Sequence, residues 1–397
     1  MAKNKLEYLK EEYEKNSKDS NLLRYISCLI VYRYYDEALT LLDKVTDNTK
    51  SNIVSLYRAR IYRFKNDEKN FLENVNLLLE TDIAYEAYIE LAEYNLTKLV
   101  KLKKGIKTKT IARTPEIEEK VNNLNNTIRN YIDQSLKIEK TGNALLKKAE
   151  LEFYEDNYDK AEICFKEILE SKDLKIQLKD FYYVRLRLAT IYVNKNNLNE
   201  AEVLVDQILN DNYPHKNKAI LLKAQILMKK GKLREAKEFY EKGLSEKSAP
   251  ADLLEYAKLC ITLSLYDEGI EYLNKVKETY MKNRAIQEEA KLKVNLGEYD
   301  EAIKLYEIML KGNNKDKNIA YIGIGVAYRI KGEFSEAINW LDKALNGNQL
   351  DQIMAKIELA KVYEDLNDFT IAKKLLEEVI EISKGKYGRL EYAKLSS

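Results

Sequence analysis

The sequence predicts an all-α fold in which antiparallel helix pairs are stacked one after another into a solenoid. Two observations indicate this. A small residue ends a short recurring phrase, and from residue 161 to residue 372 it returns at separations of 40, 35, 33, 33, 35 and 35 positions. A second small residue lies twelve positions before it in seven successive units. Self-similarity at this period is typical of repeat arrays whose unit is two short helices and two turns.

The two small residues of each unit predict how its helices pack. Small side chains on both helices let the two backbones approach closely, where larger side chains would hold them apart. Those that end the recurring phrase are Ala38, Ala161, Ala201, Ala236, Gly269, Ala302, Ala337 and Ala372. Those twelve positions earlier are Ala149, Ala189, Ala224, Ala257, Ala290, Gly325 and Ala360.

A polar turn separates the two helices of each unit. At Gly297 and Gly332, glycine supplies the left-handed C-cap, and the polar residues that follow begin the next helix. A large apolar residue then lies four positions after the small one, on the same helix face, and is predicted to enter the core. These residues are Leu42, Phe165, Val205, Tyr240, Leu273, Tyr306, Leu341 and Leu376.

These offsets resemble the tetratricopeptide repeat family, whose helix-turn-helix units carry a small residue, a tyrosine, an alanine and a large apolar residue at the same positions. Glu152 and Lys293 depart from the family's mid-helix aromatic position, and the family's tryptophan near the unit start is missing. The family's aromatic is present at Tyr192, Tyr328 and Tyr363. The resemblance implies a right-handed superhelical solenoid of antiparallel helix pairs.

The repeats divide the chain into four predicted segments. Thr114 and Pro115, followed by acidic residues, predict a helix start inside the second segment, which has no regular repeat. The segments are 1–80, a capping helix and two divergent units; 81–141, a degenerate repeat with long helices and a basic loop; 142–383, seven consecutive units; and 384–397, a tail or cap. Because solenoid ends need covering, this tail is expected to fold back over the last unit, or the end to pack against another copy.

A basic run lies in the second segment. From Lys98 to Arg113 there are seven cations and no acidic residue, and we expect a flexible loop after a helix that ends near Leu102. Such a loop can contact phosphate groups or an acidic partner, or it can be a solvated insertion. Aromatic residues do not interleave with the lysines, so base stacking has no support. The possible contact residues are Lys101, Lys103, Lys104, Lys107 and Lys109.

Composition argues against nucleic acid and membranes as partners. The chain has 67 lysine and arginine residues against 65 acidic ones, a net charge of +2. The most apolar early run, Leu22 to Val31, is about half the roughly 20 residues that a membrane span requires, and the charged N-terminus does not resemble a leader. Cys28, Cys164 and Cys260 lack metal-ligand spacing and belong to different units. We expect a reduced, cytoplasmic protein.

The sequence offers no catalytic constellation. Its one histidine, His215, lies in a turn and is expected to be an exposed linker residue. Glycine-rich phosphate loops and zinc-protease motifs are absent from the sequence. Acid–lysine pairs three positions apart, typical of helix surfaces, are Glu255 with Lys258, Glu288 with Lys291 and Glu358 with Lys361. We predict no catalytic residue, cofactor or metal.

The family resemblance implies that the first helix of each unit lines a concave side, with binding residues at its second, fifth, sixth, ninth and thirteenth positions. We call the residues carried over in this way the predicted groove. They include Arg24, Arg60, Lys147, Glu150, Arg187, Asn194, Gln225, Lys229, Lys258, Arg284, Lys291, Asn295 and Lys361, with Arg329 one step short of a thirteenth position. Cations and amides of this kind suit a peptide with acidic groups. Ordinary solvated helix residues are the alternative.

Two functions remain open. The first is a scaffold or adaptor that holds a protein or peptide in the predicted groove. The second resembles bacterial pheromone sensors, in which a peptide tightens the superhelix, and here would act through residues 1–140. The lysine and asparagine set with which part of the family holds a chaperone's C-terminal carboxylate is not reproduced, because the matching positions read Glu255, Lys258, Glu288, Lys291, Gly323 and Val326.

Overall fold

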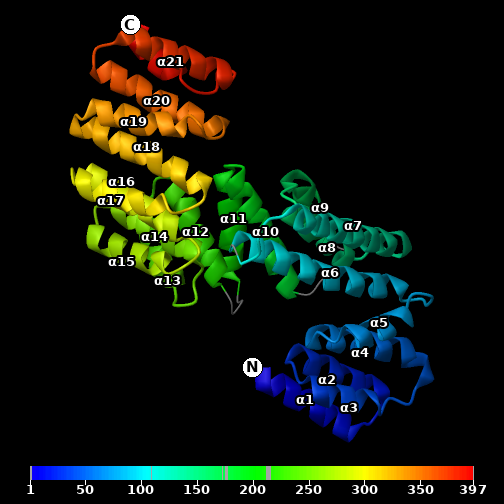
Figure 1. Cartoon of the computed structure of the whole chain (residues 1–397). Helices are drawn as coiled ribbons and strands as arrows, with labels where there is room; N and C mark the ends of the chain where they lie inside the picture. Colours follow the sequence, from blue (N-terminus) through cyan, green and yellow to red (C-terminus); the bar gives the residue numbers. More distant parts are fainter. Residues whose placement is uncertain (1, 109, 172, 175–177, 212–215, 397) are drawn as a thin grey trace. The chain divides into compact units, whose positions relative to one another are not determined.

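The computed structural model describes residues 2–108, 110–171, 173–174, 178–211 and 216–396. Over these residues the regular structure consists of α-helices and one short 3-10 helix, without strands. The chain forms two compact units, residues 1–212 and 213–397. The predicted all-α fold of antiparallel helix pairs is confirmed (Figure 1). The division of the chain into four segments stays a prediction.

The first unit contains a leading helix and five helix pairs, in which each first helix packs against the helix that follows it. A 3-10 turn, Asn48–Lys50, precedes the second pair. The helices are α1 (Ala2–Lys15), α2 (Asp19–Val31), α3 (Tyr35–Leu42), α4 (Ser51–Lys65), α5 (Glu68–Asn76), α6 (Ala84–Lys107), α7 (Pro115–Ile138), α8 (Gly142–Tyr154), α9 (Tyr158–Glu170), α10 (Leu178–Asn194) and α11 (Leu198–Asn210).

The second unit continues with five more pairs and one terminal helix. Its helices are α12 (Asn217–Lys229), α13 (Leu233–Gly243), α14 (Pro250–Thr262), α15 (Tyr266–Lys277), α16 (Lys282–Asn295), α17 (Tyr299–Met309), α18 (Asn314–Lys331), α19 (Phe334–Ala344), α20 (Gln349–Asp365), α21 (Phe369–Ile382) and α22 (Arg389–Ser396).

The recurring small residues lie where the two helices of a pair meet. All of them are buried, from Ala38 in α3 to Ala372 in α21. A Cβ atom placed on Gly269 would lie 3.2 Å from the carbonyl oxygen of Ala257, and one on Gly325 would lie 3.2 Å from that of Ala337. The predicted packing through small residues is therefore confirmed, because the partners twelve positions apart touch across the pair.

One residue with a left-handed backbone joins the helices of nearly every pair. Gly332, for example, has φ of 87° and ends α18. The other residues at this joint are Arg33, Asn66, Asp156, Asn196, Gly231, Ser264, Gly297 and Asn367. Glycine adopts this conformation without a steric cost, and asparagine and aspartate tolerate it better than most residues. The turn geometry is thus retained where the sequence no longer shows glycine.

The pair α6 and α7 differs from the others in length, because each helix has 24 residues. Thr114 caps α7 by accepting a hydrogen bond from the backbone N–H of Ile117, as predicted. The predicted end of α6 near Leu102 is wrong, since the helix continues to Lys107. Its apolar side persists to the buried Gly105, where the side chain of Ile111 packs so closely that a Cβ would not fit.

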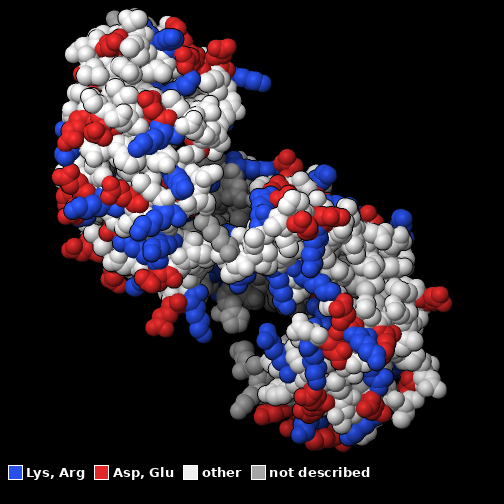
Figure 2. Space-filling view, viewed as in Figure 1, with Lys and Arg blue, Asp and Glu red and all other residues white. Residues whose placement is uncertain are grey.

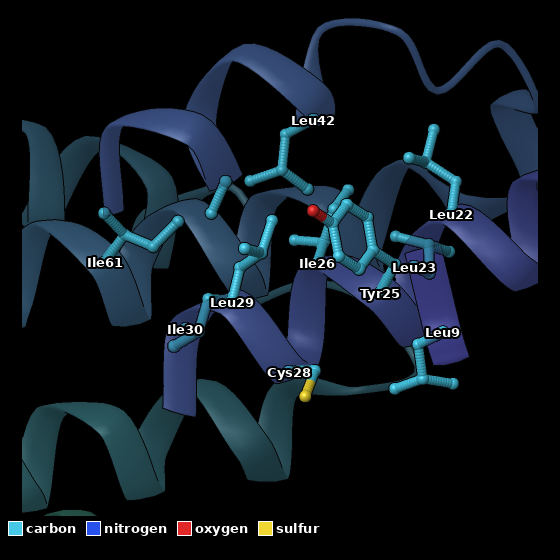
Figure 3. Packing of buried hydrophobic residues seen from close by; sticks show 11 residues of the cluster. Leu9, Leu22, Leu23, Tyr25, Ile26, Cys28, Leu29, Ile30, Leu42 and Ile61 are labelled. Carbon is cyan, nitrogen blue, oxygen red and sulfur yellow. The ribbon is translucent and has the colours of Figure 1, made fainter. Parts of the chain in front are cut away.

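The N-terminal end of the first unit is closed by α1. Leu9 of α1 packs into a cluster of buried side chains from α2, α3 and α4 (Figure 3). Leu22, Ile26 and Leu29 of α2 form the centre of this cluster, and Leu42 and Ile61 complete it. A helix that covers the apolar face of the first repeat is what a stack needs at its end.

The C-terminal end is covered by the chain itself. Tyr387, Tyr392 and Leu395 pack against the apolar cluster of α20 and α21, and Tyr392 Oη donates a hydrogen bond to Glu377 Oε1 at 2.9 Å. Of the two predicted ways to cover this end, the structure shows the fold-back. Packing against another copy stays a prediction.

Candidate functional site

The predicted groove lies on the first helices of the pairs, so its continuity depends on contact between them. In the first unit α4 contacts α6, and α6 contacts α8. In the second unit α12, α14, α16, α18 and α20 contact one another in succession. Side chains from consecutive first helices are therefore neighbours from α4 to α8 in the first unit and from α12 to α20 in the second. Cations and acids are interspersed over the visible side of both units (Figure 2).

Arg60 of α4 is bound by carboxylates of the next first helix. Its Nε donates to Glu90 Oε1 at 2.6 Å, and its Nη2 donates to Glu86 Oε2 at 2.8 Å. Arg63 Nε donates to the second oxygen of Glu90 at 2.9 Å. Glu90 is only 4% exposed, so one buried carboxylate binds two arginines and ties α4 to α6.

Lys147 of α8 continues this series of ion pairs. Its Nζ contacts Glu93 of α6 and also Glu150 Oε2, at 2.8 Å. Burial disfavours the charged ammonium, but Glu150 and Glu93 outweigh it and raise the pKa of Lys147. Arg63 Nη1 lies 3.7 Å from Glu93 Oε1. The face from α4 to α8 is thus crossed by one network of alternating charges.

Arg187 of α10 has different surroundings. Its Cζ lies 4.8 Å from the ring centre of Phe153, 4.9 Å from that of Tyr183 and 5.8 Å from that of Tyr154. Its Nη2 donates a long hydrogen bond of 3.4 Å to Tyr154 Oη, and its buried Nε has no acceptor among the described residues. Burial disfavours the charge, but Tyr183, Tyr154 and Glu150 outweigh it and raise the pKa of Arg187.

In the second unit, most groove lysines pair within their own helix. Lys258 Nζ lies 3.0 Å from Glu255 Oε1, and Lys291 Nζ lies 2.9 Å from Glu288 Oε1. Lys361 pairs in the same way with Glu358, at 2.6 Å. These are the three helix-surface pairs that the sequence predicts. Glu358 is buried, but the pairs of Lys258 and Lys291 lie nearer the surface, where such pairs contribute little to stability and exchange easily with other charges.

Arg329 and Gln225 contact neighbouring first helices. Arg329 Nη1 of α18 lies 2.8 Å from Asp365 Oδ2 of α20. Gln225 Nε2 of α12 donates to Asp252 Oδ1 of α14 at 3.4 Å. Both side chains therefore already connect repeats, which reduces their availability to a partner.

Besides Lys291, four members of the predicted groove are exposed on their helices. Arg24 is also largely exposed, although its Nη1 contacts Glu12 at 3.2 Å. The four are Asn194, Lys229, Arg284 and Asn295. Lys229 belongs to α12, and Arg284 and Asn295 belong to α16. These three exposed side chains therefore lie on first helices that both contact α14.

The predicted basic loop is largely helical, so this prediction is corrected. Lys101, Lys103, Lys104 and Lys107 belong to the last two turns of α6, and Lys109 lies outside the described residues. Lys103 Nζ donates to the backbone oxygen of Tyr154, whereas the other three are exposed. A helix makes these lysines a fixed surface instead of a flexible segment. Beside it, a cavity of about 640 Å³ is lined by both signs of charge, including Lys103, Arg113 and Glu118.

The other chemical expectations can be compared with the described residues only in part. His215 lies outside them. Within them, no group of three or more histidine, cysteine or acidic side chains is placed to hold a metal ion. All three cysteines are buried and free, and Cys28 also lines a groove of about 800 Å³ between α1, α2 and α4. In the described part of the chain, every helix is too short or too polar to cross a bilayer.

Sequence reasoning missed the carboxylates of α6. Glu86, Glu90 and Glu93 bind predicted groove cations, although the sequence analysis assigned them no role. A signal was present, because Arg60 and Glu90 are 30 residues apart and thus nearly one repeat. Searching for opposite charges one repeat apart would have indicated the pair, whereas a search at helical spacing could not.

Comparison with known proteins identifies repeats in the second half of the chain. Residues 288–351 and 355–386 match two family models described as tetratricopeptide repeat. Residues 194–276 match a family described as anaphase-promoting complex, cyclosome, subunit 3. No curated protein matches the sequence.

Solved structures include similar folds at low sequence identity. A tetratricopeptide repeat protein from Parabacteroides merdae is 18% identical with a TM-score of 0.52, over 64% of this chain and 96% of that chain. Yeast Tom70 is 14% identical with a TM-score of 0.41, over 94% and 95% of the two chains. The Cut9–Hcn1 assembly of the APC/C is 14% identical with a TM-score of 0.40, over 100% and 93%.

Proposed function

Since this chain is a tetratricopeptide-repeat protein, we propose that it is a non-enzymatic scaffold which holds a protein or peptide partner on its first helices. The observation that carries this proposal is the succession of contacts between first helices, from α12 to α20 in the second unit. Such contacts form a continuous surface built from rigid elements. Extended surfaces of this kind are what stacked repeats present to partners.

The charges on this surface support an acidic partner. Lys229 and Arg284 are exposed, and Asn295 adds an amide that can bond to peptide backbone. Lys258 and Lys291 are already paired with carboxylates of their own helices, so a partner would have to exchange those contacts. The exposed cations are therefore the groups whose loss should weaken binding most.

The test compares two charge reversals in the full chain. Lys229→Glu with Arg284→Glu changes the proposed face, and Lys304→Glu with Lys374→Glu makes the same change in charge at exposed positions of second helices. Partners recovered from native lysate with the unchanged chain are compared with those recovered with each variant. We expect a partner that is lost with the first variant and retained with the second.

Equal recovery with both variants would contradict the proposed location of the binding face. Loss with both would indicate attraction by net charge alone, which also contradicts a specific face. Circular dichroism of each variant provides the folding control, because exposed single reversals are expected to leave helix content unchanged. A recovered partner can then be titrated directly, at two salt concentrations, to measure the electrostatic share of binding.

A further inference from the structure

Arg187 differs from the paired cations of the predicted groove in what surrounds its charge. Six of them lie within 3.0 Å of a carboxylate oxygen of this chain: Arg60, Lys147, Lys258, Lys291, Arg329 and Lys361. The guanidinium of Arg187 instead lies among the rings of Phe153, Tyr154 and Tyr183. Among the described residues it forms no ion pair, and its hydrogen bond to a neutral phenol is long, at 3.4 Å.

The aromatic rings hold this cation without neutralising it. A guanidinium on an aromatic face is attracted by the ring quadrupole, which orients the group while its in-plane N–H donors still require acceptors. The Nε of Arg187 is buried and lacks an acceptor in the described structure, and a buried donor without an acceptor is unfavourable. The nearby Glu150 already bonds to Lys147 at 2.8 Å.

We propose that Arg187 recognises a carboxylate of the partner, supplied by an aspartate or glutamate side chain that lies beside an apolar group. This inference rests on the proposed function, because it identifies the partner chemistry that one first helix of the first unit, α10, would select. A carboxylate matches the planar arrangement of guanidinium donors and forms charge-assisted bonds stronger than the bond to Tyr154. The three rings supply the apolar contact and reduce screening by water.

The paired cations are poorer candidates for this role for a physical reason. A ligand carboxylate at Arg60 or Lys147 would have to displace a carboxylate of the protein and leave that acid unpaired. Stranding a partly buried charge costs more than the new pair contributes. At Arg187 the incoming carboxylate adds an ion pair and removes none.

The test uses a small probe and its uncharged isostere. The Nε–H signals of the arginines are recorded by two-dimensional NMR while the full chain is titrated with 3-phenylpropionate, and separately with 3-phenylpropanamide. We expect a saturable shift of the Arg187 signal with the acid and none with the amide. Arg187→Lys should weaken probe binding at least about tenfold, because lysine keeps the charge but lacks the planar two-point contact.

Arg329→Lys is the matched control, since Arg329 already pairs with Asp365, and it should leave probe binding unchanged. Three results would each overturn the inference. The acid and the amide could shift the Arg187 signal equally, Arg187→Lys could bind the acid probe as well as the unchanged chain does, or the Arg187 signal could stay in place up to high millimolar probe. Melting curves of Arg187→Lys confirm that the variant is folded. If the probe binds at Arg187 but no partner is lost in the charge-reversal experiment, the carboxylate site at Arg187 is retained and the proposed binding face of the second unit is rejected. The converse result would reject the site at Arg187 alone.

Discussion

Within each unit, charged residues of the first helices form different kinds of ion pairs. From α4 to α8 in the first unit, cations of α4 and α8 pair with buried or half-buried acids of α6, the first helix between them. In α14 and α16 of the second unit, the groove lysines pair with acids three positions away on their own helix. The first arrangement connects consecutive repeats, whereas the second connects residues within a single helix. At these groove positions, ion pairs therefore contribute to stacking from α4 to α8, whereas in the second unit the groove cation that joins repeats is Arg329, through Asp365.

One repeat position shows the same contrast with opposite charges. Glu152 of α8 and Lys293 of α16 both replace the mid-helix aromatic of the family pattern. Glu152 is 1% exposed and is bound by Arg129 from the preceding pair, whereas Lys293 contacts Glu298 and Glu301 of its own pair. A departure from the repeat pattern thus creates an ion pair between two helix pairs in the first unit, and ion pairs within one helix pair in the second.

The largest effect is expected from Glu90→Ala. This change leaves Arg60 and Arg63 without their shared carboxylate on a largely buried face, and we expect the free energy of unfolding to fall by about 3 kcal/mol. Glu288→Ala, which removes an exposed pair within α16, should cost only about 0.3 kcal/mol. Urea unfolding is followed by far-ultraviolet circular dichroism. Similar costs for the two variants would contradict the contrast between the units.

The next effect tests packing in the second unit. Gly325→Val places new carbon atoms against Leu341 and the carbonyl of Ala337, so we expect a loss of about 2 kcal/mol from overpacking. The single tryptophan, Trp340 in α19, packs against the buried side chains of α16, α17 and α18 and reports the unfolding of the second unit by fluorescence. Asn295→Ala, an exposed change on α16, is the control and should leave the transition in place. An unchanged transition for Gly325→Val would show that this pair has room to relax.

A smaller effect is expected on how stability depends on pH when Glu152 is replaced. Burial favours the protonated acid, but hydrogen bonds from Arg129 and Asn157 outweigh it and lower the pKa of Glu152. The ionised form therefore stabilises the fold above the unfolded pKa of about 4.3, and this contribution is lost as pH falls through the lower folded pKa. The stability gap between the unchanged chain and Glu152→Gln should narrow as pH falls from 7 to below 4. Glu246→Gln, at an exposed loop position, should show no such change.

The smallest effect is a difference in thiol reactivity that leaves stability unchanged. Cys28 is 7% exposed and lines the groove between α1, α2 and α4, whereas Cys260 is fully buried. Burial also raises the pKa of Cys260 to about 11, which keeps the thiol protonated and unreactive. With a thiol reagent at pH 8 and mass spectrometry, Cys28 should be modified at least about tenfold faster. Equal rates would indicate that the second unit opens as readily as the first.

The repeat pattern was readable because its cause is local and periodic. Ala257 and Gly269 are small because two backbones meet there, and every pair repeats that constraint. Thr114 and Pro115 were equally clear, since helix caps depend on a few adjacent residues. The last turn of α6 is less predictable, because a run of lysines without acidic residues is also typical of a loop. Its apolar face continues underneath the lysines, through Leu99 to Gly105.

The candidate site was less predictable because pairing depends on neighbours one repeat away. The sequence indicates that Arg60, Lys147 and Arg187 lie on first helices, and on that basis they are equivalent. The structure separates them, since α6 supplies acids to the first two and α8 supplies aromatic rings to the third. Partners about 30 residues apart, such as Arg60 and Glu90, can be found in the sequence only when charges are compared at the repeat period instead of at helical spacing.

The left-handed joint within each pair has a consequence for how such a chain tolerates change in length. From Arg33 to Asn367, each such joint except Asn66 is followed five positions later by the small residue of its second helix. The links between pairs vary instead, as between Gly243 and Pro250 or between Met309 and Asn314. Insertions, affinity tags or fluorescent reporters are therefore best placed between helix pairs. A residue added between the joint and the alanine of the second helix would rotate that alanine by about 100° around the helix axis and move it away from the first helix.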